Sequence, residues 1–157
     1  MSTEAVQEVT TVEDFRYTDL NEVDPTFKAI PAKVYTLQVL SGVIVDTTAK
    51  KNSKRYNIGD PVQFVKFSFG VVGDPNYTGR RVFAQPLFFN AFALRAMRNL
   101  MDKTGVYQEP GTSLDTWLEK LTIEQPLIKL GVTEIPNRND PNVTDNDVDW
   151  KVMTPAI

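Results

Sequence analysis

A run of alternating apolar and polar residues between Lys33 and Thr47 constrains the fold more than any other feature of the chain. The run, KVYTLQVLSGVIVDT, is rich in β-branched residues, and it sets Tyr35, Leu37 and Val39 on one face of a strand. Ser41-Gly42 interrupts the alternation and predicts a β-bulge. We therefore expect a long strand that bends within a β-rich domain.

Two further strands are predicted after a polar connector that ends in an Asn-Ile-Gly-Asp turn. Pro61 opens PVQFVKFSFGVV, where Phe64, Lys66 and Ser68 share one face and the opposite face carries Gln63, Val65, Phe67 and Phe69. Gly-Asp-Pro-Asn at 73–76 predicts a turn, and Arg80–Phe89 predicts a third strand in which Pro86 indicates an edge or a bulge. Three strands joined by local turns predict an antiparallel meander.

Helical spacing follows the third strand. Asn90 can cap AFALRAMRNLMDKTG at its start, and Gly105 stands where a C-cap glycine belongs. A second, shorter helix is predicted over Leu114–Leu121, with Thr112 and Asp115 in capping-box spacing and Trp117 directed inward.

The remaining sequence predicts a return to strand. LIKLGV follows Pro126, an Asn/Asp-rich loop spans 137–149, and the alternation at 149–153 predicts a closing strand. Together these features predict a mostly β domain with a small α insertion. We expect an acidic, largely disordered arm over 1–30, a folded domain over 31–153 and a short tail over 154–157.

The residue types that are missing restrict the chemistry. Among 157 residues there is neither Cys nor His. This excludes disulfides, thiolate metal sites, cysteine nucleophiles and Ser-His-Asp hydrolysis. No phosphate-loop spacing occurs, and Asp145, Asp147 and Asp149 lack the Gly and Glu of a calcium loop. We therefore expect a protein that is not an enzyme and needs no cofactor or metal.

Charge is unevenly distributed along the chain, although the net charge is only −3. Residues 1–30 hold seven acidic and two basic residues, and residues 134–157 hold five acidic and two basic residues. The middle of the chain holds 13 basic and eight acidic residues, so a basic body lies between acidic ends. A basic body of this kind favours an anionic partner.

Two groups of residues could contact nucleic acid. Cations in the connector after the first strand could bind phosphates, although a solvated loop that only keeps the domain soluble is an equal alternative. Cations and rings around the third strand could bind phosphates and stack on bases, although packing in the core is the favoured alternative for Phe83 and the arginines could pair with Asp74. The candidate residues are Lys50, Lys51, Lys54, Arg55, Tyr56, Lys66, Tyr77, Arg80, Arg81 and Phe83. We expect Tyr35, Tyr56 and Tyr77 to be the exposed rings. Most of the phenylalanines should build the core, namely most of Phe64, Phe67, Phe69, Phe88, Phe89 and Phe92.

The order of these features resembles phage-encoded single-stranded DNA-binding proteins of the OB-fold type. The resemblance runs through YTLQVLSGVIV, VQFVKFSFGVV, the Tyr-Thr-Gly-Arg-Arg turn, the helix ending in Thr-Gly, the Trp/Leu helix and PLIKLGV, and it spans 32–153. It implies an OB-like five-stranded antiparallel barrel with a helical insertion, which coats single-stranded DNA without strong sequence preference during phage DNA replication or recombination.

The resemblance also sets the expected partners. We expect single-stranded DNA as the ligand, with replication or recombination proteins recruited through the acidic termini. A homo-oligomer is an open alternative, as is a phage structural protein that assembles without nucleic acid. An enzyme built on Asp and Lys ranks last. The N-terminal residues lack a secretory pattern and no stretch approaches the ~20 apolar residues of a membrane span, so we expect no membrane and a cytoplasmic location.

Overall fold

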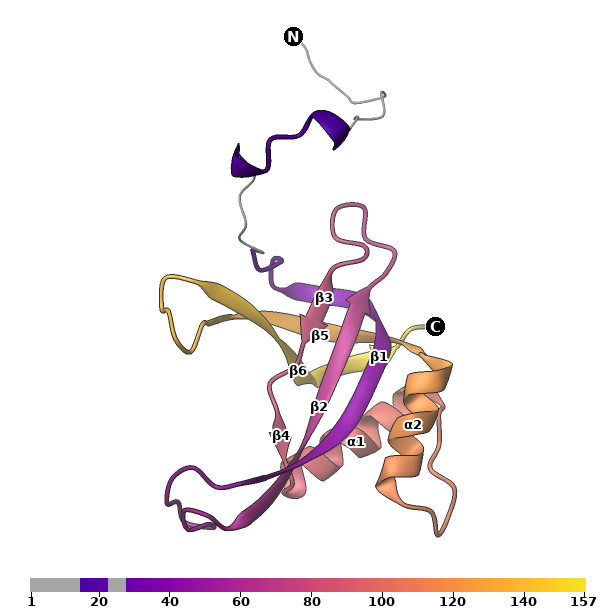
Figure 1. Ribbon diagram of the computed structural model, residues 1–157. Coiled ribbons are helices and arrows are strands. Elements are labelled where there is room, and N and C mark those ends of the chain that lie inside the picture. The colour runs from indigo at the N-terminus through magenta and orange to yellow at the C-terminus, as the bar shows by residue number, and fades with distance from the viewer. Residues whose placement is uncertain (1–14, 23–27) are drawn as a thin grey trace.

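The computed structural model describes residues 15–22 and 28–157 (Figure 1). The expected disorder of the arm over 1–30 therefore falls mostly on residues outside those described. The elements, in chain order, are η1 (Phe15–Tyr17), η2 (Leu20–Glu22), β1 (Lys33–Thr48), β2 (Pro61–Val71), β3 (Arg81–Phe83), β4 (Leu87–Phe88), α1 (Ala91–Thr104), α2 (Leu114–Glu124), β5 (Leu127–Pro136) and β6 (Thr144–Pro155).

The expectation of a mostly β, antiparallel fold with two helices is confirmed. The sheet has the order β3-β2-β1-β5-β6, and β4 pairs with β2 beyond the end of β3. β1 is the shared strand: its first half pairs with β5 and most of its length pairs with β2. The two outer strands, β3 and β6, approach each other, and the Gln85 amide donates to Asp147 Oδ1 at 2.8 Å. The sheet therefore curls strongly without closing through a ladder between these strands.

A bulge in β1 produces much of this curvature. The pairing with β2 shifts between Val39 and Ser41, one position before the predicted bulge, so Leu40 has no partner. Before the shift Val39 points into the core, and after it Gly42 does. An extra residue bends a strand and increases its twist. Figure 1 shows β1 sweeping from the β5 side of the sheet to a long hairpin with β2.

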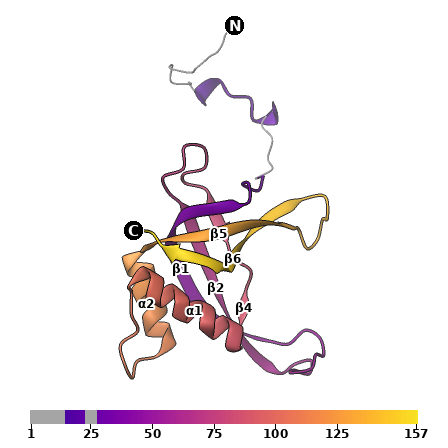
Figure 2. The ribbon, with the colours of Figure 1, turned by 180° about the vertical axis from the view of Figure 1, so that it is seen from behind.

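The core lies between the curled sheet and the helices. Phe67 and Phe69 point inward from β2, and the indole of Trp150 on β6 packs on both rings at centroid distances of 5.3 and 6.0 Å. Figures 1 and 2 show both helices gathered at one end of the sheet. Their buried faces close that end of the core with Ala93, Ala96, Met97, Leu100, Trp117, Leu118 and Leu121.

The caps explain where the helices begin and end. Asn90 Oδ1 accepts the Ala93 amide at 2.8 Å, and Gly105 takes the left-handed conformation with φ of 74°, both as the sequence predicts. The second helix begins differently: Ser113, rather than Thr112, is its N-cap. Thr112 instead closes the preceding turn by donating its hydroxyl to the Glu109 carbonyl.

Two strand predictions need correction. The predicted third strand is two short ones, because the chain leaves the β2 ladder at residues 84–86 and returns to it at Leu87, directly after Pro86. The closing strand starts at Thr144 instead of 149, because the second part of the Asn/Asp-rich segment, residues 144–149, pairs with β5. No helix among the described residues is long and apolar enough to cross a membrane.

Candidate nucleic-acid interface

The outward side of β2 carries a polar and aromatic row. Strict alternation buries Val65, Phe67 and Phe69, so Phe64 and Lys66 point to the opposite side. Because helices cover only the inner side at one end of the sheet, nothing in the described chain packs over Lys66, which is exposed. This side of β2 forms the floor of an open surface.

Two neighbouring strands extend that surface. Arg81 and Phe83 on β3 face Gly70 and Ser68 of β2, while Phe88 on β4 faces Phe64. Phe83 is 63% exposed and Phe88 47% exposed, which is unusual for large apolar side chains. We call this surface the aromatic–cationic face, and it consists of Phe64, Lys66, Arg81, Phe83 and Phe88.

Strand period explains why these rings are exposed. Val82, next to Phe83, is buried in the core, so the backbone must direct Phe83 outward. Lys66 and Arg81 make no ion pair within 15–22 and 28–157. Both cations are therefore available to an anionic ligand.

The β1–β2 loop, residues 49–60, holds the predicted cationic cluster. Four cations of the loop are exposed: Lys50, Lys51, Lys54 and Arg55. Exposure is expected whether the loop binds phosphates or only keeps the domain soluble. The Arg55 guanidinium lies 5.7 Å from the centroid of the half-buried Tyr56 ring.

Local hydrogen bonds give the loop a defined shape. Ser53 Oγ accepts the Tyr56 amide at 3.1 Å, and Asp60 Oδ2 accepts the Asn57 amide at 2.8 Å. Side-chain acceptors of this kind stabilise turns by satisfying backbone donors. The loop cations therefore lie on a turn that is stabilised by hydrogen bonds within the loop.

The loop and the aromatic–cationic face meet in a shallow hollow of about 300 Å³. Phe88 and Phe89 line one side, and Lys54, Arg55 and Tyr56 line the other. The structure therefore brings three of the predicted loop residues, Lys54, Arg55 and Tyr56, to Phe88 of the aromatic–cationic face. Lys50 and Lys51 are exposed on the same loop without lining the hollow, and Lys66, Arg81 and Phe83 lie further along the sheet on β2 and β3.

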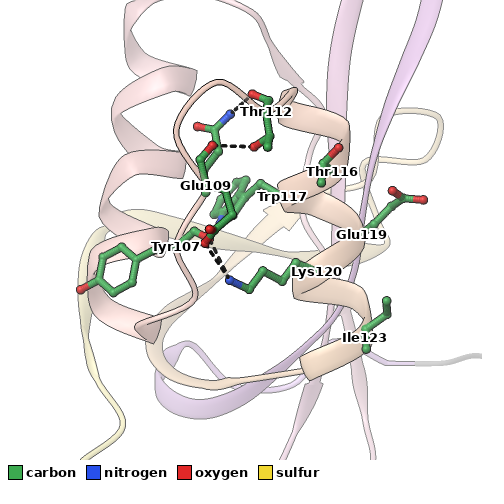
Figure 3. Close-up of a pocket in the computed structure, with 9 residues that line it drawn as sticks. Tyr107, Glu109, Thr112, Thr116, Trp117, Glu119, Lys120 and Ile123 are labelled. Carbon is green, nitrogen blue, oxygen red and sulfur yellow. Dashed lines mark hydrogen bonds and ion pairs between the residues drawn. The ribbon is translucent and has the colours of Figure 1, made fainter.

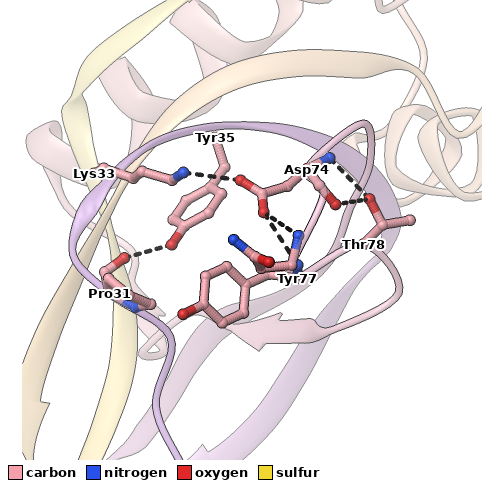
Figure 4. Close-up of polar contacts among 7 residues, drawn as sticks. Pro31, Lys33, Tyr35, Asp74, Tyr77 and Thr78 are labelled. Carbon is pink, nitrogen blue, oxygen red and sulfur yellow. Dashed lines mark hydrogen bonds and ion pairs between the residues drawn. The ribbon is translucent and has the colours of Figure 1, made fainter. Parts of the chain in front are cut away.

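Tyr77 and Arg80 belong to a different group, at the turn between β2 and β3. Figure 4 shows Tyr77 in this turn. Tyr77 packs edge-on against Tyr35 with centroids 6.4 Å apart, and Arg80 donates to the Lys28 carbonyl. The expectation that Tyr35 is exposed is wrong: it is 3% exposed, and its hydroxyl donates to the Pro31 carbonyl at 2.6 Å. Burial accordingly raises the pKa of the Tyr35 phenol.

An ion pair closes the same turn. Lys33 Nζ lies 2.8 Å from Asp74 Oδ2, while Asp74 Oδ1 accepts the amides of Asn76 and Tyr77 (Figure 4). The hydrogen bond from Lys33 lowers the pKa of Asp74, and the same bond raises the pKa of Lys33. Asp74 therefore pairs with Lys33 rather than with either arginine.

The carboxylates of the β5–β6 hairpin have structural partners. Asp145 accepts from Asn137 Nδ2 at 2.9 Å, and Asp149 accepts the Lys151 amide at 3.0 Å. Asp147 holds the Gln85 amide, as described above. In the described part of the chain no three potential ligands among His, Cys, Asp and Glu gather around one point.

A further hollow, of about 310 Å³, lies beside α2 (Figure 3). Its one cation is engaged with the protein: Lys120 Nζ donates to the Tyr107 carbonyl at 3.1 Å and pairs with Glu109. Trp117 forms its wall and donates its indole N–H to the Val106 carbonyl. This arrangement presents neither a nucleophile beside a base nor a pair of free carboxylates.

Sequence reasoning missed Phe64 and Phe88, which it assigned to the core. A signal was available, because Phe64 shares its predicted face with Lys66, and a lysine rarely faces a dry core. Phe88 and Phe89 are adjacent on a strand, so one of the two rings had to face outward.

Comparisons of this chain with protein-family models, with curated proteins and with solved structures found no match. The functional argument therefore depends on the geometry of this chain.

Proposed function

We propose that this protein binds single-stranded DNA without strong sequence preference, across the aromatic–cationic face and the β1–β2 loop. The observation that carries the proposal is the exposure of Phe83 and Phe88 beside Lys66 and Arg81, two cations that form no ion pair with any described residue. Unstacked bases offer π-faces to such rings, and phosphates offer charge to such cations. In a duplex the bases are already stacked, so the rings favour a single strand.

The fold supports this proposal. Strand β1 is shared between two hairpins, β3 and β6 approach each other, and the helices are inserted before β5. These relationships favour an OB-like five-stranded barrel built from β1, β2, β3, β5 and β6. Proteins with that barrel bind nucleic acids on the outward face of its second and third strands. Here that face is the aromatic–cationic face.

The loop cations support a phosphate-binding role as well. Lys50, Lys51, Lys54 and Arg55 extend the positive charge of the face along the hairpin. Each phosphate neutralised releases condensed counterions, which makes binding favourable and dependent on salt. The proposal thus predicts an affinity that falls steeply as salt rises.

The test is fluorescence anisotropy with a labelled single strand of about 30 nucleotides, titrated at low and moderate salt. We expect saturable binding that weakens with salt and exceeds binding to a matched duplex. Equal affinity for the duplex would contradict the stacking role of Phe83 and Phe88. Absence of binding at low salt would overturn the proposal.

A second candidate is a structural protein of phage particles that assembles with copies of itself. The observation in its favour is exposed apolar surface on the helical side, where Ile123 is 82% exposed and Leu94 and Tyr107 are about half exposed. Sedimentation velocity without nucleic acid separates the two candidates. A concentration-dependent oligomer with no affinity for DNA favours assembly.

A further inference from the structure

A second aromatic and cationic hollow lies on the other side of the first turn of α1. It has a volume of about 390 Å³ and lies between α1 and β6, which run side by side in Figure 2. Its lining consists of Phe92, Arg95, Ala96, Asn99, Trp150 and Lys151. We call it the α1–β6 hollow, and none of these residues belongs to the aromatic–cationic face.

The lining of this hollow suits an anionic ligand with flat groups. Phe92 is 41% exposed, although it is a large apolar residue at the start of a helix. Arg95 and Lys151 are exposed, and neither side chain has an ion-pair partner in the part of the chain that the structure describes. The indole of Trp150 forms an apolar floor.

The hollow lies close along the chain to the proposed DNA-binding surface. Phe88, Phe89 and Asn90 line the hollow beside the β1–β2 loop, and Phe92, two residues further on, lines the α1–β6 hollow. Residues 88–92 therefore lead from one hollow to the other. A strand that passes over Phe88 can reach Phe92 without leaving the protein surface.

The alternative exit, across the β5–β6 hairpin, is electrostatically unfavourable. Between residues 134 and 149 that hairpin carries five acids against one basic residue: Glu134, Asp140, Asp145, Asp147 and Asp149 against Arg138. These carboxylates repel the phosphates of a nucleic acid, and the repulsion is strongest at low salt. The nearest acid to the hollow along β6, Asp149, is bonded to the Lys151 amide.

We infer that a long single strand continues from the aromatic–cationic face around the first turn of α1 into the α1–β6 hollow. Arg95 and Lys151 contact its phosphates there, and Phe92 stacks on a base. This inference rests on the proposed function and extends its footprint. It predicts that the affinity for long single strands depends on Arg95 and Lys151, whereas the affinity for short ones does not.

The experiment compares R95E/K151E with wild type by anisotropy, using labelled single strands of about 8 and about 30 nucleotides. The matched control is R138E/K103E, which makes the same change in net charge at exposed residues outside the path. We expect the R95E/K151E affinity for the longer strand to fall at least about tenfold and for the shorter strand to stay near wild type. For the longer strand, the magnitude of the slope of log affinity against log salt concentration should fall by about 1.4, because two phosphate contacts are lost.

The outcomes separate the inference from the proposed function. If wild type binds neither strand, the proposed function fails. If wild type binds both strands and R95E/K151E weakens them equally, or the control weakens the longer strand as much, the inference is overturned. Thermal melting checks the fold of each variant, and R95Q/K151Q replaces the charge reversal if that variant does not fold.

Discussion

The rings of Phe64 and Phe88 lie opposite each other on β2 and β4, with centroids 5.3 Å apart and planes inclined by 55°. The pair stands on the outward side of the sheet, where an antiparallel sheet usually carries polar residues. Each ring shields part of the other from water, which reduces the cost of exposure. The pair thereby presents a rigid apolar surface beside the cations of the β1–β2 loop.

The first prediction concerns the exposed rings. Phe83→Ala and Phe88→Ala should each weaken binding of a 30-nucleotide strand by about 1–3 kcal/mol, the usual loss for one stacked base. Phe83 packs little against the core, so its variant should melt within a few degrees of wild type. Tyr107→Ala removes a similarly exposed ring beside α2 and is the control. Equal losses in all three variants would contradict a specific stacking role.

The second prediction concerns the cations of the same face. Each phosphate contact with a single strand contributes about 0.7 to the slope of log affinity against log salt, so Lys66→Gln with Arg81→Gln should reduce the slope by about 1.4. Anisotropy titrations at four salt concentrations measure the slope. Lys129→Gln, on the outward side of β5, should leave it unchanged. A slope that is the same in all variants would remove Lys66 and Arg81 from the interface.

The sequence predicted the elements whose signals are local. Asn90 and Gly105 fix the ends of α1 through one side-chain acceptor and one left-handed residue, and both can be recognised within a few positions. Alternation in β1 and β2 likewise identified the buried faces around Leu37 and Phe67. Such features depend on neighbours in the chain, which the sequence displays directly.

The features that the sequence did not predict depend on distant contacts. Tyr35 is buried because the Pro31 carbonyl and the Tyr77 ring surround it, and the turn that carries Tyr77 lies about 40 positions further on. The division of the third strand depends on where the chain leaves β2 to bring Gln85 to Asp147. In the candidate site, the sequence predicted single residues such as Lys66. It did not predict that Phe88 lies on the same face, because this depends on the pairing of β4 with β2.

The third prediction concerns the packing of α2 on β1. A Cβ atom on Gly42 would lie 2.8 Å from Phe67 Cε1 and 2.9 Å from Leu118 Cδ2, closer than real side chains approach. Gly42→Ala should therefore destabilise the protein by about 1–3 kcal/mol, the usual cost of overpacking a core. Gly70→Ala is the control, since its nearest neighbour would be Leu40 Cδ1 at 3.4 Å. Urea denaturation measures both, and an equal loss would contradict this account.

The fourth prediction concerns the ion pair between Lys33 and Asp74. In the folded state the hydrogen bond from Lys33 lowers the pKa of Asp74, so the pair stabilises the fold at pH values above the unfolded-state pKa of about 3.9. This contribution is lost as the pH falls through the lower folded-state pKa. The pKa of Lys33 is raised, so its contribution is complete below about pH 10.4 and is lost at higher pH.

Asp74→Asn should therefore be less stable than wild type at neutral pH, and the difference should close in acid. An amide keeps one acceptor for the Asn76 and Tyr77 amides, so the substitution mainly removes the charge on the partner of Lys33. Urea denaturation between about pH 2 and pH 8 gives the two curves of unfolding free energy. A difference that remains undiminished at about pH 2 would mean that Asp74 acts through the shape of the turn and not through its charge.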